Sequence, residues 1–190
     1  MKRIVIFASG SGSNAENIIN YFAKTKTAVV TQVLCNNERA KIFEKCKKLN
    51  ISCLLFSRND FISSDVVLNI LKKKADYIVL AGFLWKIPSK IINAFSDKII
   101  NIHPALLPKY GGKGMYGMNV HSAVKENNEG ESGMTIHFVN EKYDDGAIIF
   151  QAKTLISSDD SSEIIAKKVL ELEHLHYPKA IENVILEQNG

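Results

Sequence analysis

The 190-residue sequence lacks long hydrophobic runs. Its longest apolar stretches, such as residues 4–8 and 77–81, have only the length of a strand, whereas roughly 20 consecutive apolar residues are needed to cross a bilayer. The first residues carry two charges before a short apolar run, without the longer apolar region of a signal peptide. These absences predict a cytoplasmic protein with no membrane partner.

Cysteine is scarce as well. The three cysteines, Cys35, Cys46 and Cys53, are an odd number and show no paired spacing. Disulfide frameworks and zinc sites are normally recognised by paired cysteines. The sequence therefore predicts reduced thiols, and we expect neither a disulfide nor a bound metal.

The excess of positive charge is small, since 24 Lys and Arg residues stand against 20 Asp and Glu residues. The lysine-rich runs at residues 45–48 and 72–74 are typical of solvated helix ends. No DNA- or RNA-binding motif accompanies them, so we expect no nucleic-acid partner. A mild positive potential favours anionic small molecules as substrates.

What the sequence does contain is an alternation of strand and helix patterns over its first hundred residues. Short apolar runs predict buried strands, and amphipathic stretches between them predict helices. The predicted strands cover residues 4–8, 28–35, 52–56, 77–81 and 98–102, and the predicted helices residues 15–23, 38–49, 64–74 and 89–95. This order predicts an α/β, Rossmann-like fold with a mostly parallel twisted sheet, helices on both faces, and ligands at the carboxyl ends of the strands.

The pattern changes after residue 103. A loop at residues 104–117 contains six Gly or Pro residues, and loops of this length in compact domains are usually functional or mobile. A short helix at residues 120–126 and two strands at 132–139 and 147–154 are predicted next, which would form an antiparallel part. The last helix, from Ser161 or Ser162 to about residue 186, has a predicted apolar stripe of Ile164, Ile165, Val169, Leu172 and Leu175. With no repeat and no linker, residues 1–190 are expected to form a single domain.

A turn rich in glycine and serine, Ser9-Gly10-Ser11-Gly12-Ser13-Asn14, joins the first strand to the first helix. Small residues let a backbone approach a ligand, and the N–H groups and dipole at a helix N-terminus favour an anion. The turn is neither a P-loop nor a full G-x-G-x-x-G motif, and no acidic residue ends the second strand. The sequence therefore favours a phosphate site over a dinucleotide site, with a simple capped turn as the alternative.

The fifth predicted strand ends in Asn101-Ile102-His103-Pro104. Strand alternation places Asn101 and His103 on one face, with Ile102 on the other. An amide can stabilise a developing oxyanion, and an imidazole can exchange a proton near neutral pH. The pair is therefore a candidate catalytic site.

Other polar and aromatic residues leave alternatives open. Asp144 in Asp144-Asp145-Gly146 is either a turn former or a carboxylate that folds back to the imidazole and raises its pKa. His137 lies in the middle of a predicted strand and is expected to be packed or half-exposed. Trp85, after the fourth strand, is either a core residue or part of a pocket for a flat ring.

Taken together, these segments resemble the phosphoribosylglycinamide formyltransferases, the glycinamide ribonucleotide branch of the folate-dependent formyltransferase family. The resemblance covers nearly the whole chain. Its most specific part is Asn101-Ile102-His103-Pro104 followed by Leu106-Leu107-Pro108, and the glycine-rich turn narrows it to this branch. Further matching segments are Leu80-Ala81-Gly82-Phe83, His137-Phe138-Val139, Asp144-Asp145-Gly146, Gln151-Ala152, Glu173-His174 and Tyr177-Pro178.

The resemblance implies the formyltransferase fold, with a phosphate-binding half at residues 1–100 and a catalytic and folate-binding half at residues 101–190. It implies 10-formyltetrahydrofolate as co-substrate, phosphoribosylglycinamide as formyl acceptor, and a monomer or homodimer. The residues that match the family's functional positions are the catalytic Asn101, His103 and Asp144, the phosphate-binding Gly12, Ser13 and Asn14, the glycinamide-binding Glu173, and the folate-binding Leu84, Trp85, Lys86, Ile87, Asn101, Asn140 and Tyr143.

The departures from the family lie around the implied folate site. Trp85-Lys86 stands where the family often has Arg, and Ser63-Ser64 stands where an Arg before the third helix is expected. The loop at residues 111–117 is also richer in glycine than the common form. These differences concern the folate contacts and leave the catalytic trio unchanged.

The implied reaction is attack of the substrate amine on the formyl carbon. Asn101 and protonated His103 would stabilise the oxyanion, and Asp144 would keep His103 charged and help to move the proton. Two alternatives stay open at this stage: a formyltetrahydrofolate deformylase, which shares the Asn-x-His segment and the Asp-Gly turn, and a non-catalytic folate- or nucleotide-binding module. The second would be favoured if Asp144 lay more than about 10 Å from Asn101 and His103, far outside hydrogen-bond reach.

Overall fold

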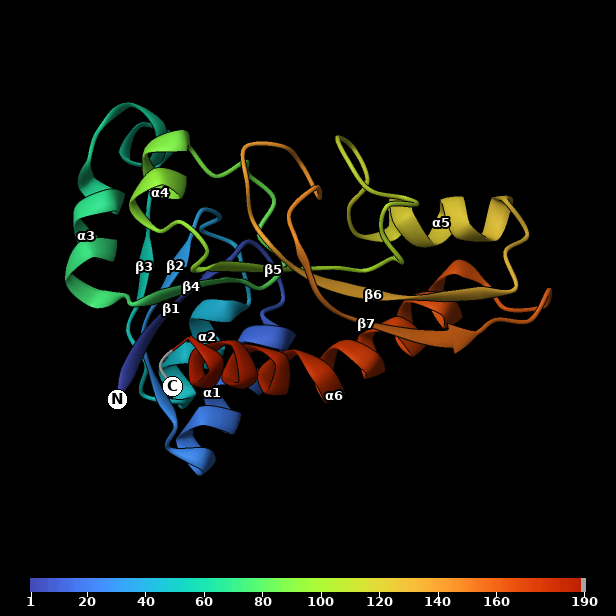
Figure 1. Cartoon of the computed structure of the whole chain (residues 1–190), viewed down its shortest axis with the longest axis horizontal. Coiled ribbons are helices and arrows are strands. Elements are labelled where there is room, and N and C mark those ends of the chain that lie inside the picture. The colour runs from blue at the N-terminus through green and yellow to red at the C-terminus, as the bar shows by residue number, and fades with distance from the viewer. Residues whose placement is uncertain (189–190) are drawn as a thin grey trace. The chain divides into compact units, whose positions relative to one another are not determined.

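A computed structural model describes residues 1–188 (Figure 1). Its elements follow in the order β1 (Lys2–Ala8), α1 (Ser13–Thr25), β2 (Ala28–Cys35), α2 (Ile42–Lys48), β3 (Cys53–Leu55), the π-helix η1 (Asn59–Ser63), α3 (Val66–Lys74), β4 (Tyr77–Leu80), α4 (Ser89–Ala94), β5 (Ile99–His103), α5 (Met118–Glu126), β6 (Glu131–Phe138), β7 (Ile148–Leu155) and α6 (Ser162–Glu187).

The seven strands form one mixed sheet in the order β3-β2-β1-β4-β5-β6-β7. Strand β1 pairs in parallel with both β2 and β4, and β2 pairs in parallel with β3, whereas β6 and β7 are antiparallel. The predicted α/β fold, mostly parallel with an antiparallel C-terminal part, is therefore confirmed. Among residues 1–188, no helix is long and apolar enough to cross a membrane.

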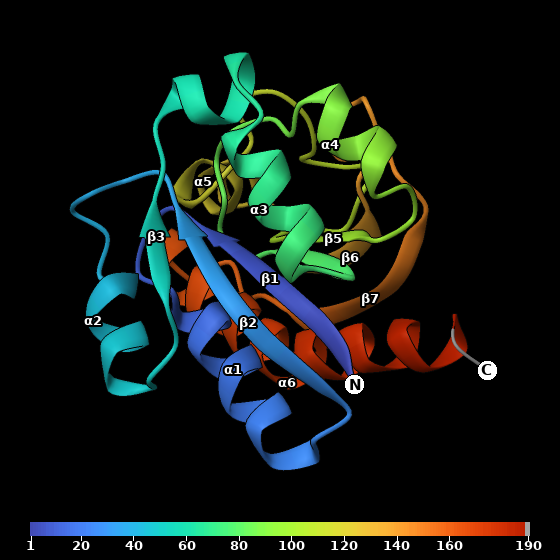
Figure 2. The ribbon, with the colours of Figure 1, turned by 90° about the vertical axis from the view of Figure 1, so that its left-hand side faces the viewer.

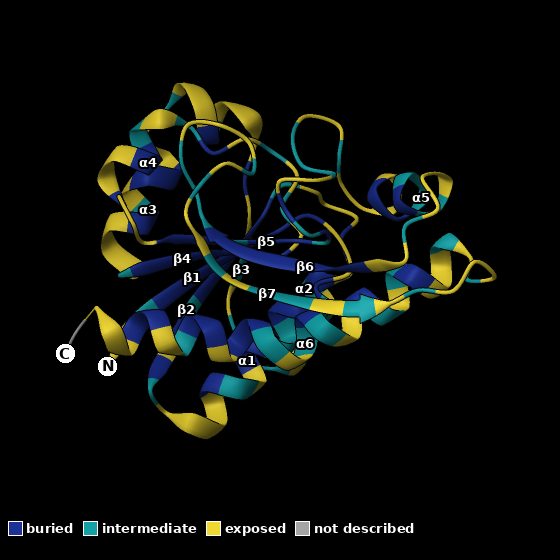
Figure 3. Ribbon diagram, turned by 45° about the vertical axis from the view of Figure 1, so that its right-hand side comes forward, coloured by how far each residue is buried: buried dark blue, intermediate teal, exposed yellow. Residues whose placement is uncertain are grey.

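The chain divides into two compact units. The first comprises Met1–Ile100 together with the segment from Ile181 onward, and the second comprises Asn101–Ala180. In the first unit, β1 is buried at five consecutive positions, as its continuous apolar run predicts. Helices α3 and α4 lie on one face of β1, β2 and β4, and α1 lies on the other (Figures 2 and 3).

The second unit contains the β6–β7 hairpin. Strand β6 is buried along six of its eight positions, while β7 alternates between exposed and half-buried residues (Figure 3). The part of α6 that belongs to this unit packs against β7, where the Phe150 and His176 rings lie 4.9 Å apart between centroids. This hairpin and the end of β5 provide the candidate catalytic residues.

Three details differ from expectation, the first being that α2 begins at Ile42 and not at residue 38. The π-helix η1 was not predicted, because its five residues mix polar and apolar types without a helical period. The predicted stripe of α6 is wrong at two positions: Ile165 and Val169 are fully buried, but Ile164 and Leu175 are 45% and 54% exposed. The buried face continues every four residues through Glu173, which is 8% exposed.

Candidate active site

The carboxyl end of β5 presents Asn101 and His103 from the second unit. Ile102 between them is buried, as strand alternation requires. His103 is 4% exposed, whereas Asn101 is only half-buried. The amide therefore remains accessible to a ligand, while the imidazole takes its hydrogen-bond partners from the protein.

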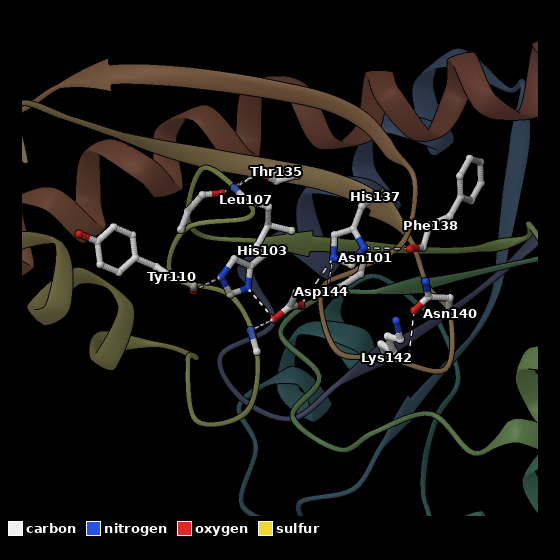
Figure 4. A network of polar contacts seen from close by, with 12 residues as sticks. Asn101, His103, Leu107, Tyr110, Thr135, His137, Phe138, Asn140, Lys142 and Asp144 are labelled. Carbon is white, nitrogen blue, oxygen red and sulfur yellow. Dashed lines mark hydrogen bonds and ion pairs between the residues drawn. The ribbon is translucent and has the colours of Figure 1, made fainter.

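The two ring nitrogens of His103 meet different groups (Figure 4). Nε2 lies 2.7 Å from the carbonyl oxygen of Tyr110, and Nδ1 lies 3.6 Å from Oδ2 of Asp144. A carbonyl oxygen only accepts hydrogen bonds, so Nε2 carries a hydrogen and donates a hydrogen bond to the Tyr110 carbonyl. Nδ1 is consequently the nitrogen that gains or loses a proton, and it does so facing a carboxylate.

Asp144 is at once a turn residue and a member of this cluster. Its φ of 53° is in the left-handed region that Asp tolerates, and a Cβ at Gly146 would collide with the carbonyl oxygen of Phe138, so the turn needs glycine there. The Gly112 N–H donates to Asp144 Oδ2 at 2.9 Å. The turn thereby aims the carboxylate at His103, and the proximity that the sequence left open is present.

Burial and charge act in opposite directions on His103. Burial lowers the pKa of His103, and this outweighs the Asp144 carboxylate and the Tyr110 carbonyl, which raise it. The carboxylate raises the pKa of His103, as the sequence predicts for a nearby Asp144, but the depth at which the ring is buried could not be predicted from the sequence. Burial raises the pKa of Asp144, but the neighbouring His137 and His103 rings and the Gly112 N–H together hold it below its usual value.

His137 is the main residue that sequence reasoning missed. It is 2% exposed, and its Nε2 lies 3.1 Å from Asn101 Nδ2 and 3.7 Å from Asp144 Oδ1. Its Nδ1 lies 2.9 Å from the carbonyl oxygen of Phe138. His137 thus touches two of the three predicted catalytic residues. The available signal was the match of His137-Phe138-Val139 to the formyltransferase family.

The segment after His103 is fixed by a buried hydroxyl. Thr135 Oγ1 donates to the Ala105 carbonyl oxygen at 2.6 Å and accepts from the Leu107 N–H at 3.0 Å and from Gln151 Nε2 at 2.9 Å. Gln151 Nε2 also donates to the Leu107 carbonyl oxygen. This network holds the chain between His103 and the Tyr110 carbonyl that sets the proton on the ring.

In the first unit, the glycine-rich turn leads into α1. Gly12 is the N-cap with a φ of 70°, and no side chain caps the helix there, so the capped-turn alternative does not describe it. A Cβ at Gly12 would come within 2.9 Å of Ile42 Cβ, which requires glycine. The predicted Ser13 and Asn14 are the first residues of the helix, half-buried and buried respectively. The first turn of α1 can therefore offer backbone N–H groups to an anion.

The predicted folate residues 84–87 also belong to the first unit. Ser9 Oγ accepts the Leu84 N–H at 3.1 Å, which links this segment to the glycine-rich turn. Trp85 is half-buried among Phe56, Phe61 and Phe83, with the Arg58 guanidinium 5.7 Å from its ring centroid.

The remaining predicted ligand residues differ in exposure. Leu84 and Lys86 are exposed, whereas the Ile87 side chain is 3% exposed and belongs to the core of the first unit. In the second unit, Tyr143 is exposed and Asn140 is half-buried, accepting the Lys142 N–H at 2.9 Å. Across residues 1–188, no group of three or more His, Cys, Asp or Glu side chains is placed to hold a metal ion.

The fold and this cluster define a class of enzyme. The formyl transferase family model matches residues 2–181, and the chain belongs to that family.

Similar proteins narrow the class. The chloroplastic phosphoribosylglycinamide formyltransferase of Arabidopsis thaliana is 37% identical over 98% of this chain and 66% of its own length, so the chain spans about two thirds of that relative. The phosphoribosylglycinamide formyltransferase of Haemophilus influenzae is 36% identical over 96% of this chain and 86% of its own length.

Solved structures of proteins with the same names are also similar to this chain. The phosphoribosylglycinamide formyltransferase of Brucella melitensis superposes with a TM-score of 0.86 at 32% identity, covering 97% of this chain and 95% of that one. Glycinamide ribonucleotide transformylase 1 of Symbiobacterium toebii gives a TM-score of 0.90 at 27% identity, covering 98% and 89%.

Proposed function

We propose that this protein transfers the formyl group of 10-formyltetrahydrofolate to the amine of 5-phosphoribosylglycinamide, a step of purine biosynthesis. The observation that carries the proposal is the cluster of half-buried Asn101, buried His103 and half-buried Asp144, with 3.6 Å between the imidazole and the carboxylate. A module that only binds folate or a nucleotide has no need of this arrangement. The family to which the chain belongs carries out this kind of group transfer.

His103 is the residue that we propose carries the proton during formyl transfer. The amine attacks the formyl carbon, and the carbonyl oxygen becomes an oxyanion that Asn101 N–H stabilises. Because the pKa of His103 is lowered, its Nδ1 is available to accept the proton that the amine loses. Asp144 then stabilises the charged ring next to the oxyanion. When the intermediate collapses, the C–N10 bond breaks and the proton passes to N10, so no proton is gained or lost overall.

Substrate binding is assigned to the residues that match the family. Gly12, Ser13 and Asn14 would bind the phosphate through the uncapped first turn of α1, whose dipole favours an anion. Glu173, buried on α6, would bind the glycinamide end. The folate would contact residues 84–87, the Asn140 and Tyr143 loop, and Asn101. Trp85 offers a flat half-buried ring for an aromatic part of the folate.

The cellular setting is also part of the proposal. Cys35 and Cys46 are free buried thiols, which fits a reducing cytoplasm. The protein would act there on two small molecules, as a monomer or homodimer.

The test is turnover of 10-formyltetrahydrofolate with and without phosphoribosylglycinamide. We expect tetrahydrofolate to form only when the ribonucleotide is present, in a one-to-one ratio with formylated ribonucleotide. Formate release without the ribonucleotide would instead indicate a deformylase. No turnover under either condition, from a protein that binds folate, would indicate a binding module.

A further inference from the structure

We infer that His137 is a positioning residue that holds the Asn101 carboxamide in the orientation needed to donate an N–H to the substrate's oxygen. The catalytic consequence rests on the proposed formyl transfer. The hydrogen-bonding pattern itself follows from the contacts of β5, β6 and the turn at Asp144 (Figure 4).

The proton on His137 is placed by its neighbour in the chain. Nδ1 lies 2.9 Å from the carbonyl oxygen of Phe138, and a carbonyl oxygen only accepts, so Nδ1 carries the hydrogen. In the neutral ring, Nε2 is then an acceptor. The donor at hydrogen-bond distance is Asn101 Nδ2, 3.1 Å away. Asp144 Oδ1 is 3.7 Å from the same nitrogen and is itself an acceptor.

This pattern fixes which way the amide faces. The reverse orientation would set Asn101 Oδ1 against the lone pair of Nε2, which is repulsive. A second proton on His137 would undo the arrangement, since the Nε2–H would be drawn to Asp144 and the amide would lose its acceptor. Because His137 is only 2% exposed, water has no ready access to replace the acceptor that the Asn101 amide would lose.

The orientation matters because an amide nitrogen has two hydrogens. One is donated to His137, and the other is left for a ligand on the half-buried side of Asn101. An oxyanion is stabilised by donors that are already aligned before the charge develops. His137 supplies this alignment for Asn101 in the way that Asp144 supplies it for His103.

The first experiment compares two substitutions by steady-state kinetics. His137→Ala removes the acceptor, whereas His137→Gln can place an amide oxygen near the Nε2 position. Losing one oxyanion donor costs about 10²–10³-fold in turnover, so a misaligned donor should cost roughly 10- to 100-fold. We expect this fall in kcat for His137→Ala, with KM within about threefold, and recovery of most activity in His137→Gln. His176→Gln, a histidine that packs on Phe150, is the matched control and should retain full activity.

The second experiment does not depend on activity. Nitrogen-15 NMR of the imidazole rings of the whole protein should show His137 with hydrogen on Nδ1 and an unprotonated Nε2. Hydrogen on Nε2 would overturn the inference, as would normal kcat in His137→Ala or equal losses in the Ala and Gln variants. A wild-type protein without transfer activity would refute the proposed function instead, and the NMR result would still decide the role of His137.

Discussion

Replacing Asp144 with asparagine removes one negative charge and little else. The asparagine oxygen can still accept the Gly112 N–H that now binds the carboxylate at 2.9 Å, so the turn should keep its shape. The charge itself faces His103 Nδ1 at 3.6 Å, and both side chains are largely buried, at 12% and 5% exposure. The substitution therefore isolates the electrostatic contribution of the carboxylate to a charged His103.

The magnitude follows from Coulomb's law. At 3.6 Å and an effective dielectric constant of about 20, two unit charges attract by about 4–5 kcal/mol, and each 1.36 kcal/mol is tenfold in rate. Because neighbouring dipoles compensate part of this loss, we expect kcat to fall about 10²–10³-fold. The matched control is Asp145→Asn, since Asp145 is exposed and its contacts are with Lys142 and Asn140. It should stay within about threefold of wild type.

The pH profile gives a second readout. Neutral His103 is the proton acceptor, so kcat/KM should fall with decreasing pH once the ring becomes protonated. Burial lowers the pKa of His103, so this acid limb lies below the ordinary histidine value of about 6.5. Asp144 raises that pKa, so Asp144→Asn should move the limb to still lower pH. A variant with wild-type kcat, or a limb that moves upward, would refute this reasoning.

Three further predictions concern stability and binding. Gly12→Ala places a Cβ 2.9 Å from Ile42 Cβ at a φ of 70°. It should lower the free energy of unfolding by about 2–4 kcal/mol in urea titrations, and it should raise KM for the ribonucleotide. Unchanged values for both would contradict the assignment of Gly12 to the phosphate site. Thr135→Val leaves Leu107 N–H and the Ala105 carbonyl without their buried partner, and should cost about 2–3 kcal/mol by the same measurement. Asp76 has its pKa lowered to about 2, chiefly by hydrogen bonding to Arg3, so its stabilisation is present above the unfolded value near 3.8 and lost as pH falls toward 2. Asp76→Asn should accordingly melt below wild type at pH 6, with a difference that vanishes near pH 2.

Much of the fold followed from local patterns. Continuous apolar runs marked β1 and β4, a mainly apolar run marked β2, and two strand-like segments around the turn at residues 140–146 marked the β6–β7 hairpin. The π-helix at Asn59–Ser63 could not be predicted from a local pattern, because its five polar and apolar residues stand in no regular order. The late start of α2 depends on a local turn, in which Asn37 accepts the Arg39 N–H at 3.1 Å.

Some residues of the candidate site could be predicted from local patterns, and others could not. Alternation within one strand was enough to pair Asn101 with His103, since both lie on β5. Asp144 required resemblance to a family, because an Asp-Gly turn in isolation indicates only a turn. His137 required the structure, because its contact with Asn101 joins residues 36 positions apart on two strands. The direction of the His103 pKa also required it, since burial is a property of the folded chain.

The most direct test of the proposed transfer is to follow the formyl carbon. Wild-type protein should be incubated with 10-formyltetrahydrofolate labelled with carbon-13 in the formyl group, together with phosphoribosylglycinamide, and the products separated and analysed by mass spectrometry. We expect the label on the ribonucleotide amine, at a rate that falls at least about 10²-fold in Asp144→Asn. Label recovered as free formate, or transfer at the same rate in the variant, would contradict the account.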